Sequence, residues 1–360
     1  MTDYGIQSLH AMKTSSVSNQ DSDFKLIDHL ETATEQAGIQ VGRIDIANFY
    51  VALKRSPMAI LAGPAGSGKV ALVKCIANLL AGTSSLQSQI VPGHAWYAGT
   101  SPANTVLIAM HARMVTEKLL DIIEEASQPQ NVQQVFIVGL THISPAELLS
   151  FFTEVAYQIQ HNQIMRIGEA HLSTPIPFPP NLLMIGTMDT TDFDWWDEDL
   201  LSSATVIDWP ANTVISQCED ISVSQDLGGE FLYSSVRNSR KAYEKLLSIM
   251  RGTKQPLQAI MLVRDILLEH RLKFSPALLD ELIVYLANAW SPHGNGLFDL
   301  STSRNLAIAS DIALAQLVLP RHIVAIQSSE TLQAKLYSFL KENMPRSKAF
   351  LKSNTKRASL

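Results

Sequence analysis

The chain has little cysteine, a modest share of charged residues and no long apolar run. Its 360 residues include two cysteines, Cys75 and Cys218, which argues against a disulfide framework or a cysteine-rich metal centre. Charged residues make up 17% and the formal net charge is −6, unlike a typical nucleic-acid-binding domain. No apolar run approaches the roughly 20 residues that cross a bilayer, and residues 1–23 are polar rather than signal-like. We therefore expect a cytoplasmic protein without a membrane contact.

What the chain does have is enough apolar surface for a large core, with 46% hydrophobic residues. In its first 210 residues, short apolar runs alternate with helical patterns, which predicts a parallel sheet covered by helices. The expected strands are 58–62, 88–91, 135–138, 181–187 and 204–208. The expected helices of this part are 24–37, 44–53, 70–80, 105–126 and one that begins at 144.

The later part of the chain has a different pattern of apolar residues, with helical spacing and no strand-like runs. Only helical patterns follow residue 241, and they predict helices at 242–250, 257–270, 276–289, 304–318 and 331–343. We divide the chain into an N-terminal polar segment and helix (1–40), an α/β nucleotide-binding domain (41–210), a linker or insertion (211–240) and a helical region with a basic C-terminal tail (241–360).

A glycine-rich turn follows the first expected strand. It consists of Gly63, Pro64, Ala65, Gly66, Ser67, Gly68, Lys69 and Val70 and runs directly into a helix. This is the order of elements in a phosphate-binding loop, where glycines let backbone N–H groups converge and the helix adds its positive end. Lys69 is expected to reach the outer phosphates, but Val70 stands where the motif has a hydroxyl ligand for Mg²⁺. The alternative is an ordinary strand–turn–helix corner that binds nothing.

Further strings carry a family resemblance: Asn48–Lys54, Ala59–Gly63, Val135–His142, Phe178–Asp192 and Asp311–Arg321. The most specific is the proline–asparagine–strand–Gly-Thr-Met segment between residues 178 and 192. With the loop, these strings resemble the AAA+ ATPases of the branch typified by the McrB subunit of McrBC restriction systems, over residues 41 to 351. The resemblance implies an α/β AAA+ P-loop core with a five-stranded parallel sheet, an all-helical lid, ATP or GTP as cofactor and assembly with other AAA+ subunits.

The resemblance also implies catalytic groups that this chain lacks. Where the family has Asp-Glu at the end of a strand, for magnesium and the attacking water, the chain has Gly139 and Leu140. Where the family has asparagine after Gly-Thr-Met, the chain has Asp189, whose charge would repel a phosphate. Where the family has Asp-Arg before the last strand, the chain has Ser202 and Ser203. With Val70 these make four departures, and all of them affect the same chemistry.

We therefore expect a degenerate AAA+ protein that binds ATP or GTP, without a complete Mg²⁺ site or efficient hydrolysis, and acts as an assembly or regulatory subunit. Its partners would be other AAA+ subunits or a complex that contacts nucleic acid. Arg304 is the nearest candidate for the family's second sensor arginine. Two alternatives stay open. One is an active ATP or GTP hydrolase that uses Asp189 or the acidic cluster 194–199 instead, and the other is a nucleic-acid adaptor that uses the basic tail.

Overall fold

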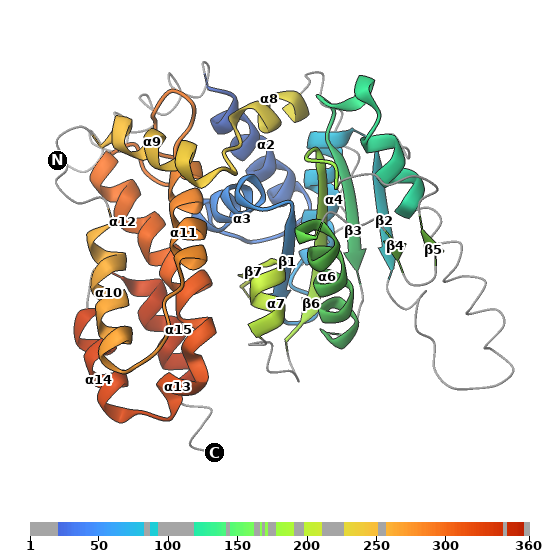
Figure 1. The fold of residues 1–360 in the computed structure, drawn as a ribbon. Helices are drawn as coiled ribbons and strands as arrows, with labels where there is room; N and C mark the ends of the chain where they lie inside the picture. Colours follow the sequence, from blue (N-terminus) through green and yellow to red (C-terminus); the bar gives the residue numbers. More distant parts are fainter. Residues whose placement is uncertain are drawn as a thin grey trace, which may run out of the picture.

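The computed structural model consists of a parallel sheet flanked by helices, with a helical region beside it (Figure 1). It describes residues 21–82, 87–92, 119–141, 145–161, 166–167, 170–171, 178–190, 198–210, 227–250, 257–340 and 344–355. Five strands form the sheet in the order β2-β3-β6-β1-β7, which confirms the predicted fold class. They are β1 (Met58–Gly63), β2 (Ser88–Pro92), β3 (Phe136–Thr141), β6 (Leu182–Asp189) and β7 (Thr205–Asp208). A separate antiparallel pair joins β4 (Arg166–Ile167) to β5 (Ala170–His171).

Strand β1 lies inside the sheet, between two strands that follow it late in the sequence. It pairs with β6 on one side and with β7 on the other, and both pairings are parallel. The register places Gly63 opposite Asp189 and Ala62 opposite Asp208. Because parallel strands end at the same edge, the turn that leaves β1 lies beside the ends of β6 and β7.

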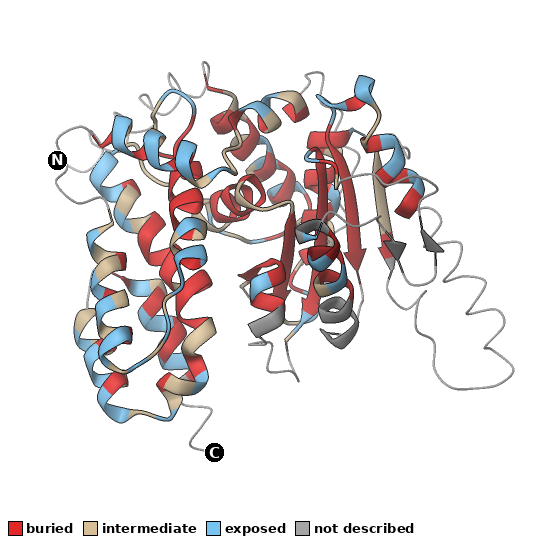
Figure 2. Ribbon diagram, in the orientation of Figure 1, coloured by how far each residue is buried: buried red, intermediate tan, exposed pale blue. Residues whose placement is uncertain are grey.

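The sheet is buried on both faces except along its edge strand β2, which is half-buried, and Figure 2 shows the inner strands in red between the helices. One face packs against α2 (Ser22–Gln36), α3 (Arg43–Arg55), α4 (Lys69–Ala81) and α8 (Leu227–Ser234). The other packs against helical residues 119–126, α6 (Pro145–Gln160) and α7 (Glu198–Ser203). Alternate residues of β1 enter the two cores, Leu61 on the first face and Ile60 on the second. Cys75, on α4, is buried in the first core.

The helical region continues the first core. It contains α9 (Ser239–Ile249), α10 (Gln258–Glu269), α11 (Pro276–Asn288), α12 (Thr302–Ala313), a π-helical turn (Leu314–Val318), a 3₁₀ turn (Pro320–His322), α13 (Ile323–Gln327), α14 (Glu330–Phe339) and α15 (Pro345–Thr355). The continuous helical segment Thr302–Gln327 is long and apolar enough to cross a membrane by length and composition alone. Of the apolar 18-residue window in this segment, 67% is buried inside the protein, as expected for a helix of the hydrophobic core.

Helix α8 is a departure from the sequence prediction, which has no helix in the segment 211–240. The sequence of α8 contains two glycines and little helical periodicity, so it gives no helix prediction. In the structure Phe231 is fully buried and meets the Tyr50 ring edge-on, with ring centroids 5.6 Å apart. Gly228 is needed for this docking, because a Cβ there would lie 2.3 Å from the carbonyl oxygen of Leu80 on α4. A tertiary contact therefore explains a residue that, in the sequence, looks like a helix breaker.

Helix α15 departs in the same way from the predicted basic tail. Its Leu351 is fully buried, and Arg346 forms an ion pair with Asp45 of α3 at 2.6 Å. The carboxylate of Asp311 on α12 accepts from the backbone N–H groups of Arg346 and Ser347, at 2.9 and 2.8 Å. Most of the predicted tail is thus a packed helix, and residues 356–360 lie outside the described part of the chain.

A buried ion pair ties the N-terminal helices together. The side chains of Asp23 on α2 and Lys54 on α3 are fully buried, and their charged atoms lie 2.6 Å apart. Tyr50 and Ser234 also donate hydrogen bonds to Asp23. Burial raises the pKa of Asp23, but the Lys54 charge and these hydrogen bonds outweigh it and leave the pKa below its usual value.

Candidate functional site

The predicted phosphate-binding loop joins β1 to α4, as the sequence indicates. Gly66 and Gly68 have φ angles of +74° and +82°, in the left-handed region that costs other residues roughly 1–2 kcal/mol. Ala65 and Gly66 are exposed, while Ser67 is buried. The chain therefore curls at the carboxyl end of the sheet, immediately before the N-terminus of a helix of 13 residues. Such a curl exposes backbone N–H groups on its open side and adds the positive end of the helix dipole.

Lys69 lies folded over its own loop. Its ammonium donates hydrogen bonds to the carbonyl oxygens of Gly63 and Pro64, at 2.8 and 2.6 Å, and to the hydroxyl of Ser67 at 3.1 Å. Burial lowers the pKa of Lys69, and the nearby Asp189 carboxylate partly opposes that shift. Within the described part of the chain, the hydrogen-bond partners of this cation are all neutral oxygens, which an anion can replace.

Asp189 lies at the end of β6, beside the loop. It is exposed and stands opposite Gly63 in the β1–β6 register. The next residue, Thr190, donates its backbone N–H to the carbonyl of Gly63 at 3.3 Å, so the end of β6 follows the start of the loop. The structure therefore places Asp189 beside the loop, where its negative charge acts on Lys69.

Gly139 and Leu140 lie inside β3 and are buried. A Cβ on Gly139 would lie 2.6 Å from Cδ1 of Ile90 and 2.8 Å from Cγ1 of Val73 on α4. Leu140 points to the opposite face and is fully buried in the second core. Both positions are thus occupied by packing between strands and helices.

Ser202 and Ser203 form the last turn of α7, just before β7. An arginine does approach this turn, but from the helical region, since Arg321 donates to the carbonyl of Leu201 at 2.7 Å. Arg321 also donates to Glu281 on α11 at 2.9 Å. The sequence analysis missed it because no local pattern places residues 201 and 321 together.

The remaining candidates are outside the site or outside the described residues. Arg304 lies in the first turn of α12, has a 73% exposed side chain and lies 4.0 Å from the carboxylate of Asp299. Val70 is half-buried on the first turn of α4. Residues 194–197 of the acidic cluster lie outside the described residues, and its last two residues, Glu198 and Asp199, begin α7.

Trp209 is the residue of this site that the sequence analysis overlooked. It directly follows β7, is 1% exposed and donates its indole N–H to the carbonyl oxygen of Ser67 at 2.9 Å. Its backbone N–H donates to the carbonyl of Ala62 at 2.6 Å. A Cβ on Gly63 would lie 2.4 Å from the Trp209 carbonyl oxygen, so glycine is required for this close approach. The only signal in the sequence is a tryptophan placed just after the last strand.

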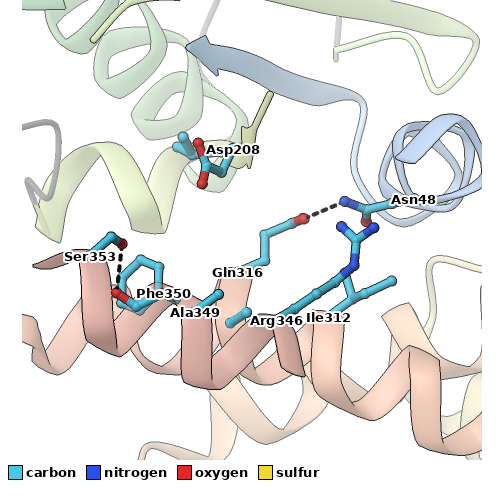
Figure 3. A pocket seen from close by; sticks show the side chains of 10 residues that line it. Asn48, Asp208, Ile312, Gln316, Arg346, Ala349, Phe350 and Ser353 are labelled. Atoms are coloured by element: carbon cyan, nitrogen blue, oxygen red, sulfur yellow. Dashed lines mark hydrogen bonds between the residues drawn. The ribbon is translucent and has the colours of Figure 1, made fainter. Parts of the chain in front are cut away.

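A cavity of about 290 Å³ lies where β7 meets the helical region (Figure 3). Asn48 on α3 donates to Gln316 at 3.0 Å and accepts from Tyr285 at 2.8 Å, so amides from both parts of the molecule meet there. Gln316 comes from the π-helical turn. The other lining residues are Val206, Asp208, Ile312, Ala315, Arg346, Ala349, Phe350 and Ser353.

Comparison with known proteins leaves the family open. No family model matches the chain, and no curated protein matches it. The structure itself gives an α/β fold in which the strands, counted along the chain, lie in the order 2-3-4-1-5, followed by a mostly helical region. This parallel sheet, with a glycine-rich loop after its first strand, is consistent with a P-loop-like fold.

Proposed function

We propose that this chain is a degenerate AAA+ protein of the McrB-like type, which binds ATP or GTP without efficient hydrolysis and acts as an assembly or regulatory subunit. One observation carries the proposal. The loop after β1 has left-handed glycines and a central lysine, whereas Gly139 and Leu140 lie packed inside β3 and leave no space there for acidic side chains.

Three features of the loop support phosphate binding. The left-handed Gly66 and Gly68 shape a curl of backbone N–H groups, and α4 begins immediately after it. The Lys69 ammonium is bound to uncharged oxygens alone, which a phosphate with its higher charge can displace. Burial lowers the pKa of Lys69, because its ammonium is partly removed from water. The negative charge of a bound phosphate would stabilise the ammonium in place of that water.

The missing groups argue against efficient hydrolysis. Phosphoryl transfer depends on a metal ion, an oriented water and cations on the developing charge. Val70 offers no hydroxyl for Mg²⁺, and Gly139 and Leu140 offer no carboxylate. Asp189 adds a negative charge next to Lys69, where a phosphate would lie. Nucleotide binding would then serve to stabilise one assembly state rather than to supply work.

The proposal extends to the partner. Ser202 and Ser203 stand where the resembling family carries the arginine that completes a neighbour's site, so a ring of identical copies would lack that group. Arg321, the arginine that reaches this turn, is held by Leu201 and Glu281 of its own chain. We infer that the chain assembles with different AAA+ subunits, and that any contact with nucleic acid is made through the complex.

A direct test measures binding and turnover separately. ATP and GTP are titrated into the purified chain by calorimetry, with and without Mg²⁺, and phosphate release is followed in parallel. We expect binding without turnover, and loss of binding in Lys69→Ala. Lys74→Ala is the matched control, because Lys74 is an exposed lysine on the same helix and should leave the affinity unchanged.

Two results would overturn the proposal in different ways. Steady Mg²⁺-dependent phosphate release that disappears in Lys69→Ala would establish an active hydrolase. No binding of either nucleotide to the wild-type chain would establish that the loop is an empty structural corner. Salt-sensitive DNA binding by the isolated chain would instead favour the adaptor.

A further inference from the structure

Trp209 connects the end of β7 to the phosphate loop across 142 residues of sequence. Its indole N–H donates to the Ser67 carbonyl, and its backbone N–H donates to the carbonyl of Ala62, the residue before the loop. Both ends of the loop are therefore fixed to one residue. That residue is buried in the first core, whereas the loop itself is exposed at Ala65 and Gly66.

The bond to Ser67 also determines where the next N–H points. A trans peptide is planar, so the carbonyl of Ser67 and the N–H of Gly68 point in opposite directions, and the described residues contain no cis peptide. Because Trp209 draws the carbonyl toward the core, the N–H of Gly68 points away from the core, to the open side of the loop. Gly68 tolerates this orientation because its φ angle is +82°, where residues with a side chain are strained.

Two further contacts hold the indole in this orientation. Phe49 on α3 meets the Trp209 ring edge-on, at 6.5 Å between centroids and an interplanar angle of 70°. Gly63, which lacks a side chain, lets the Trp209 backbone approach the end of β1. A buried ring held between α3 and the loop cannot rotate without disturbing the core, so the loop keeps its shape before any ligand arrives.

We propose that Trp209 is a positioning residue of the phosphate site, which fixes the Ser67 carbonyl so that the Gly68 N–H faces the terminal phosphates of a bound nucleoside triphosphate. This inference rests on the proposed nucleotide binding and adds the residue that presets the loop. Trp209 acts through the backbone and does not touch the phosphate itself.

The chain contains a matched control for this role. Trp290, two residues after the end of α11, is also fully buried, but its indole nitrogen has no hydrogen-bond partner among the described residues. Replacement of tryptophan by phenylalanine removes the same atoms at either position. At residue 209 it also removes a hydrogen bond to the loop, and at residue 290 it removes none.

The test compares Trp209→Phe with Trp290→Phe by calorimetry and by urea unfolding. The probes are ATP and inorganic tripolyphosphate, which carries the phosphates without a base. We expect Trp209→Phe to weaken binding of both probes at least fivefold while the variant stays folded, with a loss of stability somewhat larger than that of Trp290→Phe because it also removes the hydrogen bond to Ser67. Trp290→Phe should bind both probes within twofold of wild type. A purely structural role would lower stability and leave the affinity of the folded protein unchanged.

The outcomes distinguish a failure of the positioning role from a failure of nucleotide binding. Wild-type affinity in Trp209→Phe would overturn the positioning role and leave nucleotide binding intact, whereas no binding by the wild-type chain would remove both proposals. Where Trp209→Phe does not fold, Phe49→Leu replaces it, because it keeps the indole N–H but removes the ring that holds it. A two- to threefold loss of affinity in Phe49→Leu supports the inference, and an unchanged affinity overturns it.

Discussion

The loop after β1 and the end of β3 both contain glycine, for opposite physical reasons. At Gly66 the backbone is left-handed and a Cβ would meet nothing within 4 Å, so glycine is there for its conformation. At Gly139 the backbone is an ordinary strand, and a Cβ would collide with Ile90 and Val73, so glycine is there for its size. The first glycine keeps an edge of the sheet open to a ligand, and the second lets a helix close over the sheet.

This difference bears on whether the space beside Gly139 could hold a carboxylate. If Gly139 were a simple loss of a catalytic residue, the space of the lost side chain would remain. Instead Ile90 and Val73 occupy it, and Leu140 fills the other face. A carboxylate at residue 139 would therefore need Ile90 and Val73 to move, which a single substitution does not provide.

The largest effect is expected for Gly139→Asp. A carboxylate would be forced among apolar side chains without a partner, which costs roughly 3–5 kcal/mol. Urea unfolding measures that loss, and Gly139→Ala separates the steric share, which we expect at about 1–3 kcal/mol. Phosphate release should stay at background in both variants. A Gly139→Asp protein as stable as wild type would show that the end of β3 is not packed shut.

A smaller effect is expected for Gly66→Ala. The new methyl group meets open space, so the cost is backbone strain alone, about 1–2 kcal/mol of unfolding free energy. ATP binding should weaken with it, because the curl relaxes toward an ordinary turn. Gly66→Asn is the control, since asparagine tolerates the left-handed region better, and it should lie between wild type and alanine in both measurements. Equal losses in the two variants would argue against the conformational explanation.

The smallest effect is expected for Asp189→Asn, which leaves the shape of the loop intact. Two like charges about 4 Å apart repel by about 1 kcal/mol in water-like surroundings, so ATP should bind roughly fivefold more tightly. The gain should shrink at high salt, because Asp189 is exposed. Asp208→Asn removes an exposed carboxylate at the end of the strand on the other side of β1 and should change the affinity less than twofold. Weaker binding in Asp189→Asn would mean that this carboxylate assists the ligand.

Local patterns were sufficient to predict the sheet and the loop. Apolar runs bounded by turn residues located all five strands, and the glycines before Lys69 located the curl. They failed where a distant contact decides the local structure. Gly228 looks like a helix breaker until Leu80 is placed against it, and Trp209 gains its role from Ser67, 142 residues earlier. The site was thus predictable in its loop and not in the residues that support it.

The ion pairs of Glu281 bear on how the two parts of the molecule move. Glu281 on α11 meets Arg55 of α3 at 3.3 Å and Arg321 at 2.9 Å, and Arg321 also reaches Leu201 on α7. A hinge motion between the sheet and the helical region would strip Arg55, whose side chain is 8% exposed, of its counter-charge. Burial already lowers the pKa of Arg55, so that motion is opposed by electrostatics as well as by packing. Any hinge motion between the two parts is therefore coupled to the loss of a largely buried ion pair.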